Sequence, residues 1–290
     1  MTNQSLTWKR LVRFIANDGK EYYGEPEDSH IDVGLAVAAK EDVKVKVLAT
    51  KTALDSHAQF TGETKSITKL LSPITQSEVG TIRCIGLNYK DHAAELGLDL
   101  PKVPELFTKP ATSLHDPCNP IVVAEKLSHE LDAEVEVAIV IGKDAKNVSA
   151  HDALQYVLGY TVANDLTCRD VQKTVSQWGY AKGFDAFCPL GPTLVSAESL
   201  GDPSKLQVKT TLNGFVMQDQ SASNMIFTIA EIISYLSVGT TLQKGTVILT
   251  GTPKGIGASY TPPRFLKQGD DLKVWISHGL GTLTNTIKLQ

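Results

Sequence analysis

Residues 132–142 constrain the fold most, because they place two acidic side chains within an otherwise apolar, alternating pattern typical of a β-strand. Side chains two residues apart point to the same face of a strand, so Glu134 and Glu136 share one face with Ala138 and Val140. The opposite face is entirely apolar, which predicts burial on both sides. Two neighbouring anions at a buried strand end repel each other and are poorly solvated. Either this end is exposed to solvent, or a cation lies between the carboxylates.

The composition indicates an ordinary globular protein: of 290 residues, 42% are hydrophobic and 21% are charged. The net charge is −4 and Lys and Arg form no cluster, so we expect no nucleic-acid partner. No apolar stretch approaches the roughly 20 residues that span a bilayer, and the N-terminus lacks the apolar run of a signal peptide. The four cysteines form no C-x-x-C pair, which favours reduced thiols. We therefore expect no membrane partner and a cytoplasmic location, with a mitochondrial one left open.

The order of the predicted elements indicates a β-rich α+β fold with two domains. Residues 1–75 contain a hairpin and further short strands, and we expect them to form a small β-rich N-terminal domain. Residues 76–290 are expected to form the larger, catalytic domain. Capping signals within it predict one helix over 149–158 and a second that opens at Thr228 and continues to Gly239.

Three carboxylates form the first candidate site. Asp165 lies at the end of one predicted strand, and Glu134 and Glu136 lie near the start of another. Hard oxygen ligands of this kind suit Mg²⁺ or Mn²⁺, and the absence of a matching His and Cys set argues against zinc. The spacing alone supports the alternative equally well, namely an edge strand with a solvated acidic face and a turn aspartate.

Two further features could hold an anion. Lys182 stands between apolar residues and a glycine, and could steady a carboxylate or an enolate, although a surface lysine with a buried stem is the more common case. Residues 250–257 form a glycine-rich turn whose backbone amides and hydroxyls could make a nest for a carboxylate. The simpler interpretation of that turn is a tight reversal that needs positive φ angles.

His92 and Glu95 form a candidate catalytic pair. Three residues apart on a predicted short helix, they share one face. A carboxylate that orients an imidazole raises its basicity and gives a general base that activates water. Considered in isolation, an exposed helical pair without catalytic role is the more common case.

These signals occur together, in order, in a pattern that resembles the fumarylacetoacetate hydrolase superfamily from about residue 80 to the C-terminus. The branch it is most similar to is that of the fumarylacetoacetate hydrolase domain-containing protein 2, which is associated with oxaloacetate tautomerisation; residues 187–192 and 262–270 point to it. The matching motifs are Gly86-Leu87-Asn88-Tyr89-Lys90-Asp91-His92, Glu134-Val135-Glu136, Val140-Ile141-Gly142-Lys143, Asn164-Asp165-Leu166-Thr167-Cys168-Arg169-Asp170, Lys182-Gly183-Phe184-Asp185 and Leu249-Thr250-Gly251-Thr252-Pro253-Lys254-Gly255.

The resemblance implies the β-roll catalytic domain typical of this superfamily and a homodimer. It also implies that Mg²⁺, or alternatively Mn²⁺, is the cofactor and is held by Glu134, Glu136 and Asp165. Residues 92–105 are expected to form a lid segment over bound ligand, and residues 178–180 to shape the pocket with it.

The resemblance assigns roles to further residues around the expected substrate, a small 2-oxo acid. The catalytic residues it implies are His92, Glu95 and Lys182. The substrate-binding residues it implies are Gln172, Thr250, Gly251 and Thr252.

The expected activity is that of a metal-dependent enzyme that acts on 2-oxo acids through a metal-stabilised enolate. Protonation at carbon gives tautomerisation, loss of CO₂ gives decarboxylation, and attack of hydroxide on a distal carbonyl gives carbon–carbon hydrolysis. Position 87, often arginine in acylpyruvate hydrolases of this family, is Leu87, which removes an anion contact. This favours oxaloacetate tautomerase or decarboxylase activity over the alternative, hydrolysis of acylpyruvates or other β-diketo acids. A metal-binding interaction protein is the non-enzymatic alternative.

Overall fold

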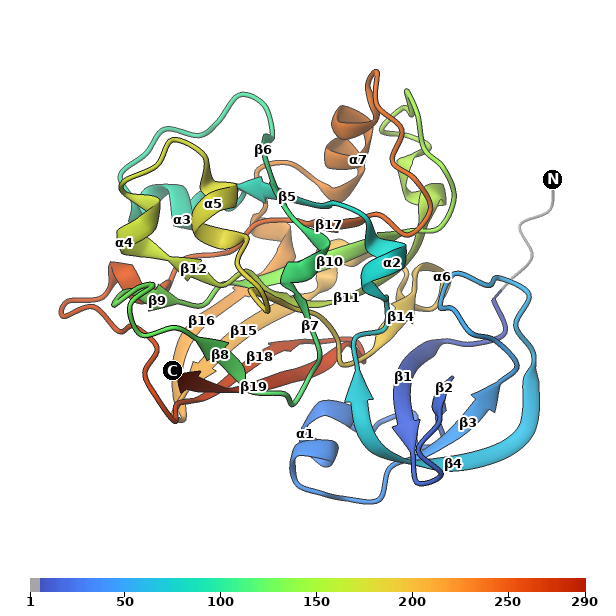
Figure 1. Cartoon of the computed structure of the whole chain (residues 1–290). Coiled ribbons are helices and arrows are strands. Elements are labelled where there is room, and N and C mark those ends of the chain that lie inside the picture. The colour runs from blue at the N-terminus through green and yellow to red at the C-terminus, as the bar shows by residue number, and fades with distance from the viewer. Residues whose placement is uncertain (1–5) are drawn as a thin grey trace.

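The computed structural model of the chain describes residues 6–290 and consists mainly of β-strands. Figure 1 shows a small lobe, formed by strands β1 to β4 with helix α1, beside a larger body that contains the remaining elements. No helix within the described range is long and apolar enough to cross a membrane. The fold is thus β-rich α+β, as the sequence predicts, whereas the exact domain boundary at residue 75 stays a prediction.

One ten-stranded sheet runs through both parts, because β1 pairs with β2 and β4 in the lobe and with β14 in the body. Across this sheet the strands are β2 (Glu21–Pro26), β3 (Lys44–Leu48), β4 (Phe60–Leu71), β1 (Arg10–Ala16), β14 (Leu194–Ser196), β11 (Val157–Asn164), β10 (Val135–Ile141), β17 (Val247–Leu249), β5 (Ile82–Gly86) and β6 (Glu105–Lys109).

Smaller sheets and short helices complete the body. The five-stranded sheet has the order β16 (Phe215–Ser221), β15 (Gln207–Leu212), β18 (Asp271–Ile276), β19 (Gly281–Leu289) and β8 (Ile121–Val123). The two-stranded pairs are β9 (Leu131–Asp132) with β12 (Thr167–Cys168) and β7 (Leu114–His115) with β13 (Cys188–Pro189). The α-helices are α1 (Val33–Ala38), α2 (Gln76–Val79), α3 (Lys90–Glu95), α4 (Arg169–Gln172), α5 (Trp178–Lys182), α6 (Ala197–Leu200) and α7 (Ile229–Ser237). The 3₁₀ helices are η1 (Ala111–Ser113), η2 (Ala153–Tyr156), η3 (Pro203–Lys205), η4 (Ala222–Asn224) and η5 (Gly257–Ser259).

Strand β10 lies in the interior, and its two faces pack into two different hydrophobic clusters. Val137 and Ile139 belong to one cluster, while Ala138 and Val140 belong to the other. This confirms the alternation predicted from the sequence. β10 runs antiparallel to β11 and β17, so its first residues lie beside the last residue of β11. That register brings acidic residues from two distant segments of the chain to the same end of the sheet.

Two predicted helices have different outcomes. The helix from Thr228 is confirmed, because α7 begins with a capping box in which the Thr228 hydroxyl accepts from the Glu231 amide and the Glu231 carboxylate accepts from the Thr228 amide. The helix over 149–158 is wrong, since only the single turn η2 forms before β11 begins at Val157. The β-branched and aromatic residues that follow pair with β10 instead, and this tertiary pairing overrides the capping signal.

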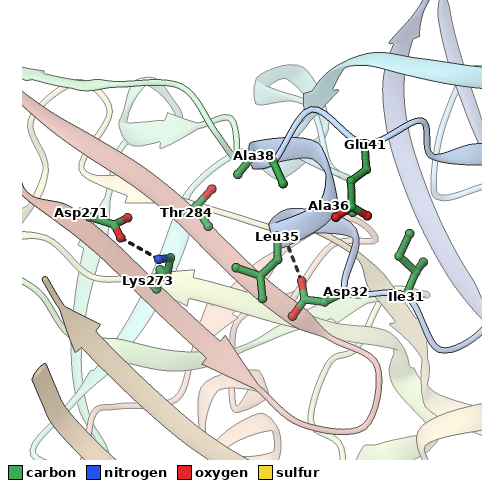
Figure 2. Close-up of a pocket in the computed structure, with 10 residues that line it drawn as sticks. Ile31, Asp32, Leu35, Ala36, Ala38, Glu41, Asp271, Lys273 and Thr284 are labelled. Carbon is green, nitrogen blue, oxygen red and sulfur yellow. Dashed lines mark hydrogen bonds and ion pairs between the residues drawn. The ribbon is translucent and has the colours of Figure 1, made fainter. Parts of the chain in front are cut away.

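Helix α1 packs against the start of β19 and connects the lobe to the body. Asp32 caps α1 by accepting from the Leu35 amide, and it also accepts from the amide and hydroxyl of Thr282, at 3.1 and 2.6 Å. Figure 2 shows Asp32 and Leu35 on one side of a cavity of about 620 Å³, with Asp271 and Lys273 on the other. The close approach depends on a glycine, because a Cβ on Gly34 would lie 1.7 Å from the Thr282 carbonyl oxygen.

We expect Gly34→Ala to separate the lobe from β19 and to lower the free energy of unfolding by about 1–3 kcal/mol, the usual cost of overpacking. Urea unfolding measures this as a lower midpoint. The exposed neighbour on the same helix, Ala38→Ser, is the control and should change the free energy by no more than about 0.5 kcal/mol. Equal midpoints for Gly34→Ala and Ala38→Ser would contradict the packing described here.

Candidate active site

Glu134, Glu136 and Asp165 form a compact group at the end of β10 and β11. One carboxylate oxygen from each lies within 4.8 Å of the others, and all three residues are buried, with at most 4% of their surface exposed. The Asp165 amide donates to the Glu134 carbonyl at 2.9 Å, which fixes the spacing of the two segments. Burial excludes the alternative of a solvated acidic edge strand.

Two of these carboxylates are paired with buried cations. Lys182 donates from Nζ to Glu134 Oε2 at 2.8 Å and to Asp165 Oδ2 at 2.6 Å. Arg169 donates to Glu134 at 2.5 Å, and Lys109 donates to Asp165. Although burial opposes it, the charges of Lys182 and Arg169 lower the pKa of Glu134. Glu134 therefore stays ionised in the interior.

Glu136 differs, because it forms no ion pair with any residue in the range 6–290 and accepts one hydrogen bond, from the Gly251 amide at 2.6 Å. Burial, followed by the charges of Asp165 and Glu134, raises its pKa well above the ordinary value. A buried carboxylate with two like-charged neighbours and no counter-ion is the arrangement that a cation would relieve. The three carboxylates thus fit a divalent metal with oxygen ligands.

Sequence reasoning missed Lys109, Arg169 and Asp132, which is the second partner of Arg169. Arg169 bridges Glu134 to Asp132, to which its Nε donates at 2.9 Å, and Asp132 also accepts from the amides of Gly257 and Ala258. Lys109 ends β6 just before a proline, and no spacing signal distinguishes it from a surface lysine. Arg169 belongs to the motif over residues 164–170 that carries the family resemblance, and this motif is the only sequence signal for its role.

The predicted pair at the start of the lid segment is formed. His92 Nδ1 lies 2.9 Å from Glu95 Oε2, and His92 is buried and lines the same cavity as the three carboxylates. The other oxygen of Glu95 accepts from the Gly255 amide at 2.8 Å, which ties helix α3 to the turn over 250–257. A histidine whose Nδ1 is held by a carboxylate presents Nε2 as a proton acceptor.

The turn after β17 contacts the strand that carries the candidate metal ligand Glu136, and little of the turn faces the cavity. The Thr250 hydroxyl donates to the Val137 carbonyl and the Gly251 amide donates to Glu136, so both contact β10. Gly251 has a φ of 95°, and a Cβ there would lie 2.7 Å from the Asn88 Cβ. Of the four predicted substrate-binding residues, only Gln172 and Thr252 line the cavity.

The cavity has a volume of about 580 Å³ and is lined by both polar and apolar side chains. Helices α3, α4 and α5, which lie together in Figure 1, each contribute residues to its lining. We call eight of the polar lining residues the polar end: His92, Glu134, Glu136, Asp165, Arg169, Gln172, Lys182 and Thr252. The other charged lining residues are Asp99, Glu105 and Lys173. The apolar side chains of the lining are Ile85, Leu87, Leu96, Leu98, Phe107, Trp178, Ile256 and Ala258.

We expect Glu136→Gln to abolish tight binding of Mn²⁺, because it removes one of three ligands and much of the negative charge that attracts the ion. Titration calorimetry with MnCl₂ measures the affinity, and Glu63→Gln, an exposed acid on β4, is the matched control. Without metal, Glu136→Gln should melt no lower than the wild type, since the substitution relieves repulsion among the carboxylates. Unchanged Mn²⁺ affinity in Glu136→Gln would show that the group is not a metal site.

Comparisons with known proteins agree with this geometry. The family model described as fumarylacetoacetate (FAA) hydrolase, C-terminal, matches residues 81–288. Caffeoylpyruvate hydrolase of Neonothopanus nambi is 42% identical over 98% of this chain and 94% of its own length. Oxaloacetate tautomerase YisK of Bacillus subtilis is 44% identical over 76% of this chain and 73% of its own. The crystal structure of 2-hydroxyhepta-2,4-diene-1,7-dioate isomerase from Mycobacterium marinum superposes with a TM-score of 0.80 and 33% identity, covering 98% of this chain and 99% of that one. The chain is therefore an enzyme of the fumarylacetoacetate hydrolase family.

Proposed function

We propose that this enzyme hydrolyses a carbon–carbon bond in 2,4-dioxo acids of the acylpyruvate type. One observation carries the proposal: His92, whose Nδ1 is held by Glu95, lines the same cavity as the three carboxylates and Lys182. Moving a proton on a 2-oxo acid requires no activated water. Delivering water to a distal carbonyl requires a base that activates it.

The polar end of the cavity supplies the charge for the pyruvate portion of the substrate. A divalent ion held by Glu134, Glu136 and Asp165 would polarise the 2-oxo group and lower the energy of negative charge on its oxygen. Lys182 adds a fixed positive charge next to this position. The buried group of ion pairs contains four carboxylates and three cations. The carboxylates are Asp132, Glu134, Glu136 and Asp165, and the cations are Lys109, Arg169 and Lys182. A bound dication would therefore make this group net positive and suited to an anionic substrate.

His92 and Glu95 handle the water. His92 Nε2 accepts a proton from water, and the hydroxide oxygen bonds to carbon 4 of the substrate. The bond between carbons 3 and 4 then breaks, and its electron pair remains with the pyruvate fragment as the enolate. Return of a proton to carbon 3 gives pyruvate and a free carboxylic acid, so that one water is consumed. Glu95 orients the imidazole throughout and stabilises its charged form.

The whole-length match to a relative named as an acylpyruvate-type hydrolase supports this proposal, since the tautomerase relative from Bacillus subtilis matches over three quarters of the chain. That relative nevertheless makes oxaloacetate tautomerisation or decarboxylation the second candidate. Oxaloacetate carries a second carboxylate. Of the cavity's remaining cations, Lys173 is paired with Glu130, and Arg169 with Asp132 and Glu134. The cavity thus offers no uncommitted cation among its lining residues for this group.

Magnesium is the metal that we propose, because all three protein ligands are oxygens and Mg²⁺ keeps further positions for water and substrate. The homodimer and the cellular location stay predictions from the sequence. Gel filtration with light scattering would test the first of these.

We expect His92→Ala to lower the rate of acetylpyruvate cleavage by about 10²–10⁴-fold, the usual contribution of a general base. Its rate of oxaloacetate enol–keto conversion should change far less, because that reaction needs no activated water. The matched control is His57→Ala, an exposed histidine of the small lobe, which should retain both rates.

Wild-type enzyme that converts oxaloacetate rapidly but cleaves no acylpyruvate would contradict hydrolysis and support the second candidate. Cleavage that persists unchanged in His92→Ala would contradict the role of the pair. Release of CO₂ distinguishes decarboxylation of oxaloacetate from hydrolysis of an acylpyruvate, because both reactions yield pyruvate and only decarboxylation yields CO₂.

A further inference from the structure

The apolar part of the cavity includes an unusual run of exposed leucines in the lid segment. Leu96, Leu98 and Leu100 are 43%, 53% and 52% exposed, and the first two line the cavity. Adjacent exposed apolar side chains are costly in water and mark binding surfaces more often than isolated ones do. Their continuity with the catalytic cavity indicates that they cover a bound ligand. We call these three residues the leucine rim.

Two aromatic side chains form a second apolar surface of the same cavity. Trp178 on α5 and Phe107 on β6 pack edge to face, with ring centroids 5.9 Å apart and an interplanar angle of 74°. Gly86 on β5 makes room for this pair, because a Cβ there would lie 2.1 Å from the Trp178 ring. Lys182 Nζ lies 5.2 Å from the centroid of Phe107. This aromatic wall therefore begins beside the cation that we assign to the reacting end.

Leu87 adds to the apolar lining at an energetic cost. Its φ of 46° is in the left-handed region, which is unfavourable for a leucine. The next residue holds this conformation: Asn88 donates to the carbonyls of Thr250 and Phe227 and accepts from the Phe227 amide. An apolar side chain thus lines the cavity where a polar one could have bound a charged substrate group.

We propose that the distal group of the substrate is neutral, planar and aromatic, and that it packs on Trp178 and Phe107 beneath Leu96 and Leu98. The inference rests on the proposed function, which it extends from acylpyruvates in general to those with an aryl-bearing acyl group. Charge supports it, since Asp99 and Glu105 line the cavity and would repel a distal carboxylate. Size supports it as well, because 580 Å³ is within the range of roughly 300–1,000 Å³ that holds drug-sized ligands, far larger than pyruvate.

Benzoylpyruvate and acetylpyruvate test this directly, because they share the pyruvate portion and differ only in a phenyl or methyl group. We would measure their dissociation constants by calorimetry with His92→Ala in the presence of Mn²⁺, so that neither ligand is consumed. Benzoylpyruvate should bind at least tenfold more tightly. Trp178→Ala added to this background should reduce the preference about tenfold, as expected for loss of an aromatic contact and the area it buries.

Trp178→Ala could disturb α5, so a second variant, Leu98→Ala, tests the same surface independently. Leu98 is half exposed, and its truncation leaves the core intact. It should also reduce the preference for benzoylpyruvate, by about threefold, while acetylpyruvate binding stays constant. The control is Phe60→Ala, an exposed aromatic residue on β4, which should leave the ratio unchanged.

Equal binding of the two ligands, or a preference that survives both Trp178→Ala and Leu98→Ala, would overturn the inference. A clear aromatic preference in binding, combined with no cleavage of either compound by the wild type, would overturn the proposed hydrolysis and leave the inference standing. Preferential binding together with faster cleavage of benzoylpyruvate by the wild type would support both.

Discussion

The uncompensated negative charge of Glu136 is the constraint on which the rest of the site depends. A carboxylate within the hydrophobic interior, beside two others, keeps its charge only if positive charge reaches it. The chain supplies cations to Glu134 and Asp165 through Lys182, Arg169 and Lys109, but leaves Glu136 with a single backbone amide. The space between the Glu136 carboxylate and those of Glu134 and Asp165 suits a divalent ion. The fold holds this unfavourable arrangement because β10 is fixed by strands on both sides.

The supporting contacts extend from this charge to the catalytic pair. Gly251 links the turn after β17 to Glu136, and Gly255 in the same turn donates to Glu95. Gln218, which sequence reasoning also missed, donates to the Thr252 hydroxyl and accepts from the Val135 amide. One turn therefore positions both a proposed metal ligand and the residue that orients the proposed general base. The two functions that we propose for the cavity, stabilising charge and activating water, share a single structural support.

Local patterns explain which features could be predicted from the sequence. The alternation of residues 132–142 gave the buried strand and its acidic face, and the capping box at Thr228 gave helix α7, because both depend on neighbours in the chain. Lys109 and Arg169 could not be assigned, since their partners lie 56 and 35 residues away and only the folded sheet brings them together. The predicted helix over 149–158 is wrong for the same reason. From Val157 the chain pairs with β10, a distant segment that the local sequence does not indicate.

A crystal structure of the enzyme grown with Mn²⁺, with anomalous diffraction recorded, tests the central claim most directly. The account predicts one anomalous peak at the end of β10, roughly 2.1 Å from an oxygen of each of Glu134, Glu136 and Asp165, a distance typical of small divalent ions. It further predicts that Lys182 keeps its contacts with Glu134 and Asp165 when the ion is bound. No peak at this position, with the three carboxylates turned apart, would contradict the account.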